Sequence, residues 1–127
     1  MIPYIGLEKN PPVPKTIRGK TAWLREITQD WNQFRGPDRN GDASKQNPPL
    51  NLSVAPALCW QVSCGAGHSS IVTKGNLILT LEQQGNFEVL VARNFEDGKV
   101  AWQVSEKTRW DDMMSGEGPR STPTIFG

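Results

Sequence analysis

The chain has 127 residues, of which 36% are hydrophobic and 21% are charged, with a formal net charge of +1. This length suffices for one domain with a hydrophobic core, and the balanced charge argues against a nucleic-acid or acidic-membrane partner. No apolar run approaches the roughly 20 residues that span a bilayer. Twelve glycines and ten prolines predict short elements joined by turns rather than long helices.

Residues 1–28 are predicted to form an irregular, proline-rich extension. The start of the chain does not show the basic segment followed by an apolar one that marks a signal peptide. A short helix of one or two turns is possible from Thr21 to Thr28, with Thr21 as its N-cap. Acidic residues dilute the positive charge and only Trp23 lies among the basic residues, so we expect a solvated tail rather than a nucleic-acid-binding arm.

Residues 31–41, WNQFRGPDRNG, form a conspicuous run ahead of any clear strand. Trp31 and Phe34 are expected to pack across the edge of a sheet, because aromatic side chains contribute large buried areas. Gly36-Pro37 is expected to bend the chain, and residues 35–56 have the composition of a loop.

The segment from Asp38 to Asp42 superficially resembles a calcium-binding loop. Gly41 stands at the fourth position of that loop instead of the sixth, and Pro49 stands where a bidentate glutamate is required. The segment is therefore predicted to be a turn, and no metal site is assigned.

Beyond residue 57 the sequence changes to short apolar runs about every ten residues, separated by turn residues. Asp97-Gly98 is a strong hairpin signal. This spacing predicts an all-β, antiparallel architecture. The strands are expected at residues 58–62, 69–73, 76–81, 87–93 and 99–104.

Cys59 and Cys64 are the two cysteines of the chain. Their odd separation places them on opposite faces of an extended strand, so a direct disulfide between them is geometrically poor. We expect two half-buried thiols, since free cysteine is often buried.

The second half of the chain contains an internal repeat. Trp60-Gln61-Val62 recurs 42 residues later as Trp102-Gln103-Val104, and SSIVTKG at 69–75 aligns without a gap with STPTIFG at 121–127. The serines are 52 residues apart, so the second copy carries ten additional residues. Periods of about 40–50 residues with four strands each are typical of β-propeller blades.

The tryptophan strand, the Gly-x-Gly-x-x-Ser turn and the Asp-Gly-Lys hairpin together resemble the pyrroloquinoline-quinone-type (PQQ-like) β-propeller family. This family includes quinoprotein alcohol dehydrogenases and BamB-like assembly lipoproteins. WNQFRGPDRNG is similar to the segment before the first blade in many bacterial members, and GHSS and GPRSTPT are similar to inner strands. The resemblance covers residues 29–127. The chain departs from it at Asp97-Gly98-Lys99, where Thr-Gly-Lys is usual, and at Ile71, where proline is common.

The resemblance implies an incomplete β-propeller: about one four-stranded antiparallel blade plus flanking strands. Trp60 and Trp102 would fill the gap between packed sheets, and glycines of the repeat would turn the chain towards the central axis. Because a propeller needs about 4–8 blades, we expect an N-terminal fragment of a longer protein. Its parts would be a lead-in at 29–56, an outer strand near 57–63, the first blade at 68–104, an insertion at 105–118 and the start of a second blade at 119–127.

Three functions are compatible with this resemblance. We expect a non-catalytic binding or scaffolding module whose partners are the missing blades or another protein. The alternatives are the N-terminal part of a PQQ-dependent quinoprotein oxidoreductase and a truncated product without independent function. The calcium ligands, catalytic aspartate, stacking tryptophan and vicinal cysteines of the quinoproteins do not fall on matching positions, so PQQ is implied by the resemblance alone. The family would also imply a periplasmic or exported protein.

No catalytic residue is predicted. His68 precedes Ser69 and Ser70, but adjacent strand residues point to opposite faces and no acid is identified to orient the imidazole. We expect hydrogen bonding within the loop at this position.

The insertion is the best candidate for contact with a protein partner. It is expected to be a solvated loop that combines acids, methionines and an aromatic residue, a composition that suits adaptable contact surfaces. Neighbouring carboxylates in such a loop could also hold a hard cation, although a solvated surface is expected. The candidate contact residues are Trp110, Asp111, Asp112, Met113 and Met114.

Overall fold

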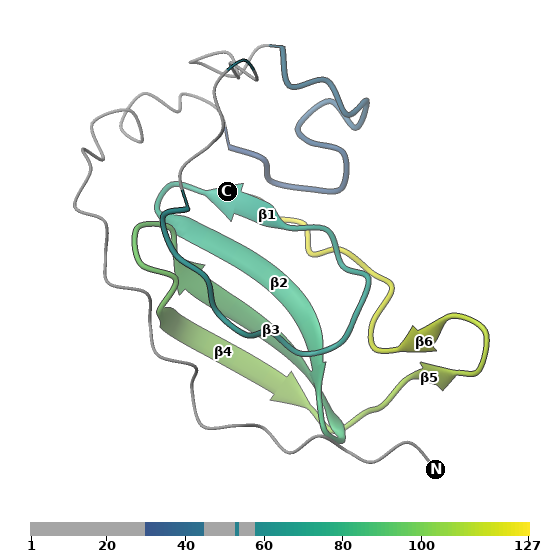
Figure 1. Ribbon diagram of the computed structural model, residues 1–127. Coiled ribbons are helices and arrows are strands. Elements are labelled where there is room, and N and C mark those ends of the chain that lie inside the picture. The colour runs from purple at the N-terminus through teal and green to yellow at the C-terminus, as the bar shows by residue number, and fades with distance from the viewer. Residues whose placement is uncertain (1–29, 45–52, 54–57) are drawn as a thin grey trace.

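The computed structural model describes residues 30–44, 53 and 58–127, and within these ranges the protein is all-β, with no helix. Four strands form one antiparallel sheet in the order β1-β2-β3-β4, and two more form a small second sheet (Figure 1). The prediction of an all-β chain with a four-stranded antiparallel unit is confirmed. The strands are β1 (Val72–Lys74), β2 (Leu77–Gln84), β3 (Phe87–Asn94), β4 (Val100–Glu106), β5 (Asp111–Asp112) and β6 (Gly116–Glu117).

The expected extension at 1–28 lies outside the described residues, as does most of the lead-in beyond residue 44. Within the described ranges there is no long apolar helix of the kind that crosses a membrane.

Tight turns at glycines set the order of the strands. Gly75 (φ 54°) and Gly85 (φ 60°) sit in two-residue turns that connect β1 to β2 and β2 to β3. This left-handed conformation is accessible to glycine at little cost and lets adjacent strands pair without a long loop. In the longer β3–β4 connection, the Asp97 carboxylate accepts a hydrogen bond from the Lys99 amide at 3.0 Å. The Asp-Gly signal thus lies where the sequence predicted a chain reversal.

The first strand of the sheet is shorter than predicted and begins later in the sequence. A strand was expected at 69–73, whereas β1 begins at Val72 and an isolated bridge pairs Ala66 with Gln83 of β2. Between these two contacts the Ser69 hydroxyl accepts a hydrogen bond from the Leu81 amide at 3.4 Å. A side chain therefore replaces part of the backbone ladder, which explains why residues 67–71 run beside β2 without forming a strand.

One face of the sheet, here called the core face, carries a buried hydrophobic cluster, while the buried Val89 and Val91 lie on the opposite face. Register places Val72, Leu79 and Ala92 side by side across β1, β2 and β3, and these residues are 0%, 6% and 0% exposed. Leu90 and Ile125 pack against them. Ile125 belongs to the C-terminal segment, residues 119–127, and this segment therefore covers the β1–β2 side of the core face.

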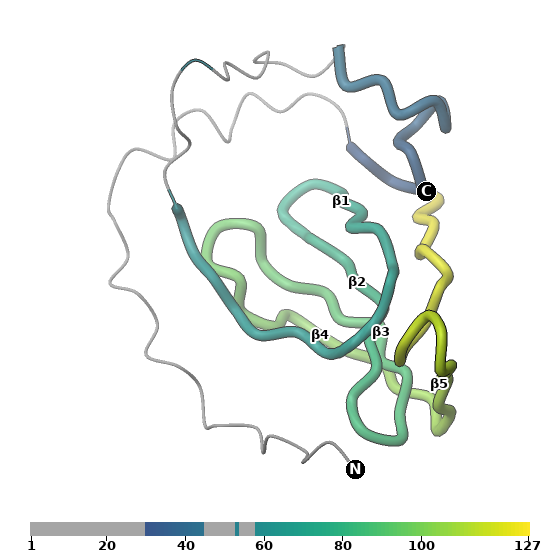
Figure 2. The backbone as a smooth tube through the Cα atoms, turned by 45° about the vertical axis from the view of Figure 1, so that its right-hand side comes forward, coloured from purple at the N-terminus to yellow at the C-terminus, as the bar shows by residue number. Residues whose placement is uncertain are grey.

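The opposite face is covered by residues 58–66. On this face the buried Glu82 carboxylate accepts a hydrogen bond from the Gly65 amide and forms an ion pair with Arg93 at 3.5 Å. The Trp60 indole donates to the Phe95 carbonyl at 2.8 Å. Figure 1 shows this segment crossing the sheet, and in Figure 2 it lies on the other side of the sheet from the C-terminal segment.

The expectation of an outer strand near 57–63 differs from the structure, in which residues 58–63 belong to neither sheet. The Trp60 contact holds them across a sheet face, where a neighbouring strand edge is not in position to pair with their backbone. Cys59 and Cys64 are both exposed and form no disulfide, so the expected half-burial is wrong. The segment turns Trp60 towards the sheet and leaves both cysteines at the surface.

The β1 edge of the sheet is closed by the lead-in. The Thr73 amide donates to the Trp31 carbonyl at 2.8 Å, and the Trp31 amide donates to the Thr73 hydroxyl at 3.1 Å. Asn32 in turn accepts a hydrogen bond from the Ile125 amide at 2.9 Å. The lead-in thus joins β1 to the C-terminal segment, and the expected edge packing of Trp31 agrees with its half-buried position.

The same expectation is wrong for Phe34, which is 57% exposed. The chain turns away from the sheet directly after Gln33, where the Gln33 carbonyl accepts a hydrogen bond from the Gly36 amide at 3.0 Å. Gly36 (φ 81°) lies against the Trp31 indole, so the turn folds over the tryptophan and carries Phe34 outwards.

The β4 edge is open in the described part of the chain. β4 has β3 as its strand neighbour there, and all seven of its residues are exposed. Trp102 is 42% exposed and Val104 is 63% exposed. The rings of Trp60 and Trp102 therefore differ in environment, since Trp60 is half-buried against Gly98 while Trp102 lies on an open surface.

Two glycine substitutions separate backbone strain from loss of the Trp60 contact. Gly85→Ala introduces a left-handed alanine into open space and is expected to lower the free energy of unfolding by about 1–2 kcal/mol. Gly98→Ala (φ 70°) adds a Cβ 2.7 Å from the Trp60 ring, and overpacking is expected to cost at least about 1 kcal/mol more. Urea unfolding followed by tryptophan fluorescence measures both. Equal destabilisation by the two variants would contradict the packing of Trp60 on Gly98.

Candidate partner-binding site

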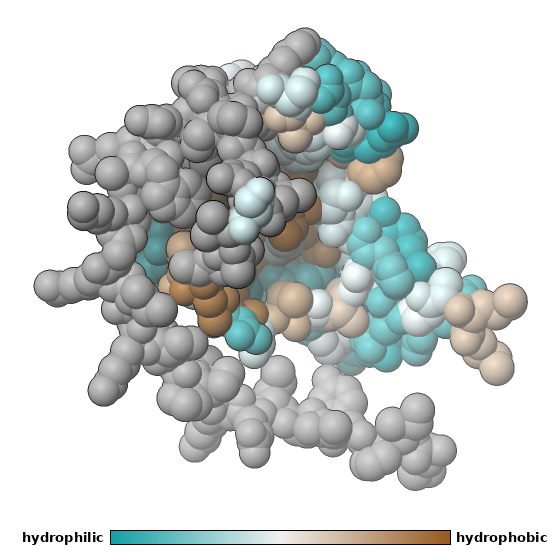
Figure 3. Space-filling model, turned by 45° about the horizontal axis from the view of Figure 1, so that its top comes forward, coloured by the Kyte–Doolittle hydropathy of each residue, from teal (hydrophilic) through white to brown (hydrophobic). Residues whose placement is uncertain are grey.

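The insertion at 105–118 forms a short β-hairpin rather than the expected loop. β5 and β6 pair antiparallel, with Asp111 opposite Glu117 and Asp112 opposite Gly116. Met113 and Met114 occupy the tip, and both side chains are fully exposed. In Figure 3 an apolar tip projects at the right of the molecule beside hydrophilic atoms. The two predicted contact methionines therefore lie at the most accessible point of the hairpin.

Asp112 shapes the turn at this tip. Its Oδ1 accepts hydrogen bonds from the Ser115 hydroxyl at 2.9 Å, the Met114 amide at 2.9 Å and the Ser115 amide at 3.0 Å. These bonds, the Ser115 hydroxyl first, hold the pKa of the Asp112 carboxyl below its usual value because they stabilise the ionised form. Asp112 thus acts as a cap for the turn that presents Met113 and Met114.

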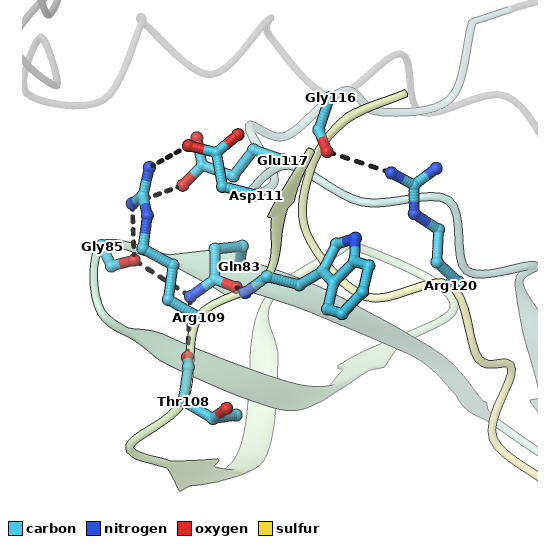
Figure 4. Close-up of polar contacts among 9 residues, drawn as sticks. Gln83, Gly85, Thr108, Arg109, Asp111, Gly116, Glu117 and Arg120 are labelled. Atoms are coloured by element: carbon cyan, nitrogen blue, oxygen red, sulfur yellow. Dashed lines mark hydrogen bonds and ion pairs between the residues drawn. The ribbon is translucent and has the colours of Figure 1, made fainter. Parts of the chain in front are cut away.

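Arg109 holds the base of the hairpin together. Its guanidinium lies 2.7 Å from the Glu117 carboxylate and 3.4 Å from that of Asp111, and it donates to the Gly85 carbonyl at 3.2 Å (Figure 4). The two acids that face each other across the strands therefore share one cation. After the end of β6, Arg120 donates to the Ser115 hydroxyl at 2.6 Å and the Gly116 carbonyl at 3.0 Å.

These contacts bear on the idea that the acids hold a hard cation. Asp111, Asp112 and Glu117 direct oxygens to arginine or to amide and hydroxyl hydrogens, and within the described ranges no group of three or more acidic, histidine or cysteine side chains is arranged to hold a metal ion. The arrangement serves to shape and anchor the hairpin.

Gln83 connects the hairpin to the main sheet. Its side chain is buried, with 3% of the residue exposed, and its amide group donates to the carbonyls of Gly85 and Thr108, both at 3.0 Å. Its Oε1 accepts a hydrogen bond from the Trp110 amide at 3.3 Å. One buried side chain therefore fixes both the β2–β3 turn and the entry to the hairpin (Figure 4).

Sequence reasoning missed Gln83, Arg109 and Arg120. Gln83 and Gln84 are adjacent and chemically identical, so only the alternation of faces along β2 could have separated the buried one from the exposed one. For Arg109, the opposite charges of Asp111 and Glu117 would have been a usable signal if the insertion had been expected to form a hairpin.

An open pocket of about 290 Å³ lies at the foot of the hairpin, lined by Glu88, Trp110, Pro119, Arg120 and Ser121. Trp110 is 52% exposed, so part of its indole is available at the surface. The lining combines an aromatic ring and a proline with one carboxylate and one guanidinium. Such a mixture suits a polypeptide segment with both apolar and charged side chains.

The other residues considered from the sequence have local roles. The His68 amide donates to the Pro119 carbonyl at 2.9 Å, and the Ser69 hydroxyl donates to the Ser70 carbonyl at 3.1 Å. In the turn after Pro37, Asn40 accepts a hydrogen bond from the Asp42 amide at 2.9 Å. These contacts organise backbone turns.

The two copies of the Gly-x-Gly-x-x-Ser segment, residues 65–70 and 116–121, lie side by side. Besides the His68–Pro119 bond, the Ser70 amide donates to the Thr122 hydroxyl at 3.0 Å. A Cβ on Gly118 would lie 2.8 Å from Gly67 Cα and would also clash with the Ala66 carbonyl. Glycine is needed here because the two backbones touch.

Comparison of the chain with protein-family models, with curated proteins and with solved structures gives no match. Function must therefore be inferred from the repeat and from the contacts of the chain itself.

Removal of the Gln83 side chain tests whether it anchors the hairpin. Gln83→Ala leaves the Thr108 carbonyl and the Trp110 amide without their partner, and we expect a loss of about 1–3 kcal/mol in the free energy of unfolding. Gln84→Ala is the matched control, because Gln84 is the exposed neighbour on the same strand. Hydrogen exchange at the Trp110 amide should accelerate in Gln83→Ala and remain unchanged in Gln84→Ala. Unchanged exchange in both variants would contradict the anchoring role.

Proposed function

We propose that the chain contributes the opening blade of a PQQ-like β-propeller and acts as a non-catalytic binding or scaffolding module, with the β5–β6 hairpin as its contact with a protein partner. The observation that carries this proposal is the side-by-side packing of the two repeated segments, 65–70 and 116–121. Consecutive blades bring their inner segments together in this way, and a glycine at each copy permits the close approach.

The coverage of the sheet supports the same proposal. Residues 58–66, which contain the first Trp-Gln-Val copy, lie on one face, and the C-terminal segment with Ile125 lies on the other. A blade is flanked by one neighbour on each face, so a chain that begins in one neighbour and continues into the next would show this pattern.

Within the described part of the chain, part of the core face is uncovered, as expected for a blade that is not packed against its neighbour. Register places Trp102 beside Ala92 and Val104 beside Leu90, on the face that carries the core. Trp102 and Val104 are nevertheless 42% and 63% exposed. A further sheet packed on this half of the face would bury an aromatic and an aliphatic side chain, a favourable contribution to association.

The hairpin supports the binding role. Its base is fixed by Gln83 and Arg109, while Met113 and Met114 project at the tip. A rigid base lowers the entropy cost of binding, and flexible thioether side chains adapt to an apolar partner surface. Two adjacent, fully exposed methionines on an ordered support would anchor a protein partner.

Oxidative footprinting tests this role. We expect Met113 and Met114 to form sulfoxide at least about tenfold more slowly in the native complex than in the purified chain, because a bound partner excludes peroxide from both thioethers. Mass spectrometry of the chain after equal doses of hydrogen peroxide in cell extract and in buffer gives the two rates. A double Met113→Ser, Met114→Ser variant should lose the partner while keeping its fold. Equal oxidation in extract and in buffer would overturn the hairpin contact.

A further inference from the structure

The open edge of β4 has a defined hydrogen-bonding pattern that follows from register. Gln84 and Phe87 close the two-residue β2–β3 turn, so Phe87 and every second residue after it direct backbone groups towards β2. The intervening residues of β3 point to β4, in agreement with the Asn94 amide, which donates to the Lys99 carbonyl at 2.8 Å.

This alternation passes from β3 to β4. Leu90 and Ala92 are opposite Val104 and Trp102, whose amides and carbonyls therefore point inwards to β3. Gln103 and Ser105 consequently direct their amides and carbonyls outwards, at the edge that has no strand neighbour in the described part of the chain. Such an edge is a template for a further strand.

The side chains that flank Gln103 on β4 would complement those of a second, antiparallel copy of β4. If two copies of β4 pair antiparallel with Gln103 opposite Gln103, Trp102 of each copy falls opposite Val104 of the other. These would be non-hydrogen-bonded pairs, in which side chains approach most closely, and both members lie on the core face. Aromatic and β-branched residues form favourable cross-strand pairs.

We propose that β4 pairs with β4 of a second copy of this chain around a two-fold axis at Gln103, joining two four-stranded sheets into one. The contact is isologous, so both copies contribute the same residues and the assembly closes at a dimer. Each copy has a β-bulge at Ala101, because Arg93 pairs with Val100 and Ala92 pairs with Trp102. In the dimer, pairing between the two β4 strands is therefore limited to the residues between the bulge of one copy and the bulge of the other. The contact goes beyond the propeller proposal, because an outer strand keeps its edge available within a blade.

Proline at Gln103 is the sharpest test, because it removes an outward amide that makes no hydrogen bond within the sheet. Proline is tolerated on an edge strand whose amide faces out, and the two-fold contact loses two hydrogen bonds. Sedimentation velocity of the full chain with reductant, over a range of concentrations, should show a monomer–dimer equilibrium. Gln103→Ala should retain it, and Gln103→Pro should weaken it about thirtyfold or more.

Hydrogen exchange provides a readout that does not depend on the variants. In the wild-type chain, protection of the Gln103 and Ser105 amides should rise with concentration, while protection of the Leu90 amide, which points to β4, should not change. A monomer at all concentrations, a dimer that is insensitive to Gln103→Pro, or protection of the two outward amides that does not vary with concentration would each overturn the proposal. The last result would show that another segment of the same chain occupies the edge.

Discussion

The burial of Gln83 is the constraint on which the rest of the structure depends. The Gln83 backbone exchanges hydrogen bonds with Ala66, at 2.7 and 3.2 Å, and so holds the segment that precedes β1. Its side chain binds the turn after β2 and the entry to the β5–β6 hairpin. A buried amide left without partners would be costly, so these three segments must be positioned together. The relation between the sheet, the first repeat and the candidate contact hairpin is therefore fixed at one residue.

The β1 edge of the sheet is covered and the β4 edge is open in the described part of the chain. The proposed functions depend on this difference. At the β1 edge, Trp31 satisfies the Thr73 amide and Pro119 satisfies that of His68, which closes the edge with non-strand segments. At the β4 edge, the described residues provide no neighbour beyond β3. Antiparallel sheets need partners or protection at such edges. The proposed assembly contacts therefore lie at β4 and at the open half of the core face, and the hairpin projects from the end of the sheet where β2 and β3 are joined.

The parts of the fold that were predictable from sequence are those governed by local rules. β2, β3 and β4 follow from apolar runs, and their order follows from turns at Gly75 and Gly85, where backbone conformation is decided by a few adjacent residues. Long-range contacts decided the remainder. The hydrogen bond between the Trp60 indole and the Phe95 carbonyl determines that residues 58–63 cross a sheet face instead of pairing as a strand. The exposure of Phe34 depends on the turn at Gly36. The methionines of the proposed contact could be chosen from composition, but the anchor at Gln83 could not, because its burial arises only when the insertion folds back onto β2.

The most direct test of the central claim, that the two repeated segments pack against each other, is hydrogen exchange at the His68 and Ser70 amides. Both residues lie outside the strands, and protection of their amides requires the contacts with the Pro119 carbonyl and the Thr122 hydroxyl. We expect these two amides to exchange as slowly as those in the interior of β3. Exchange as fast as that of the exposed Met113 amide would show that the repeats do not pack together, and the propeller proposal would lose its support.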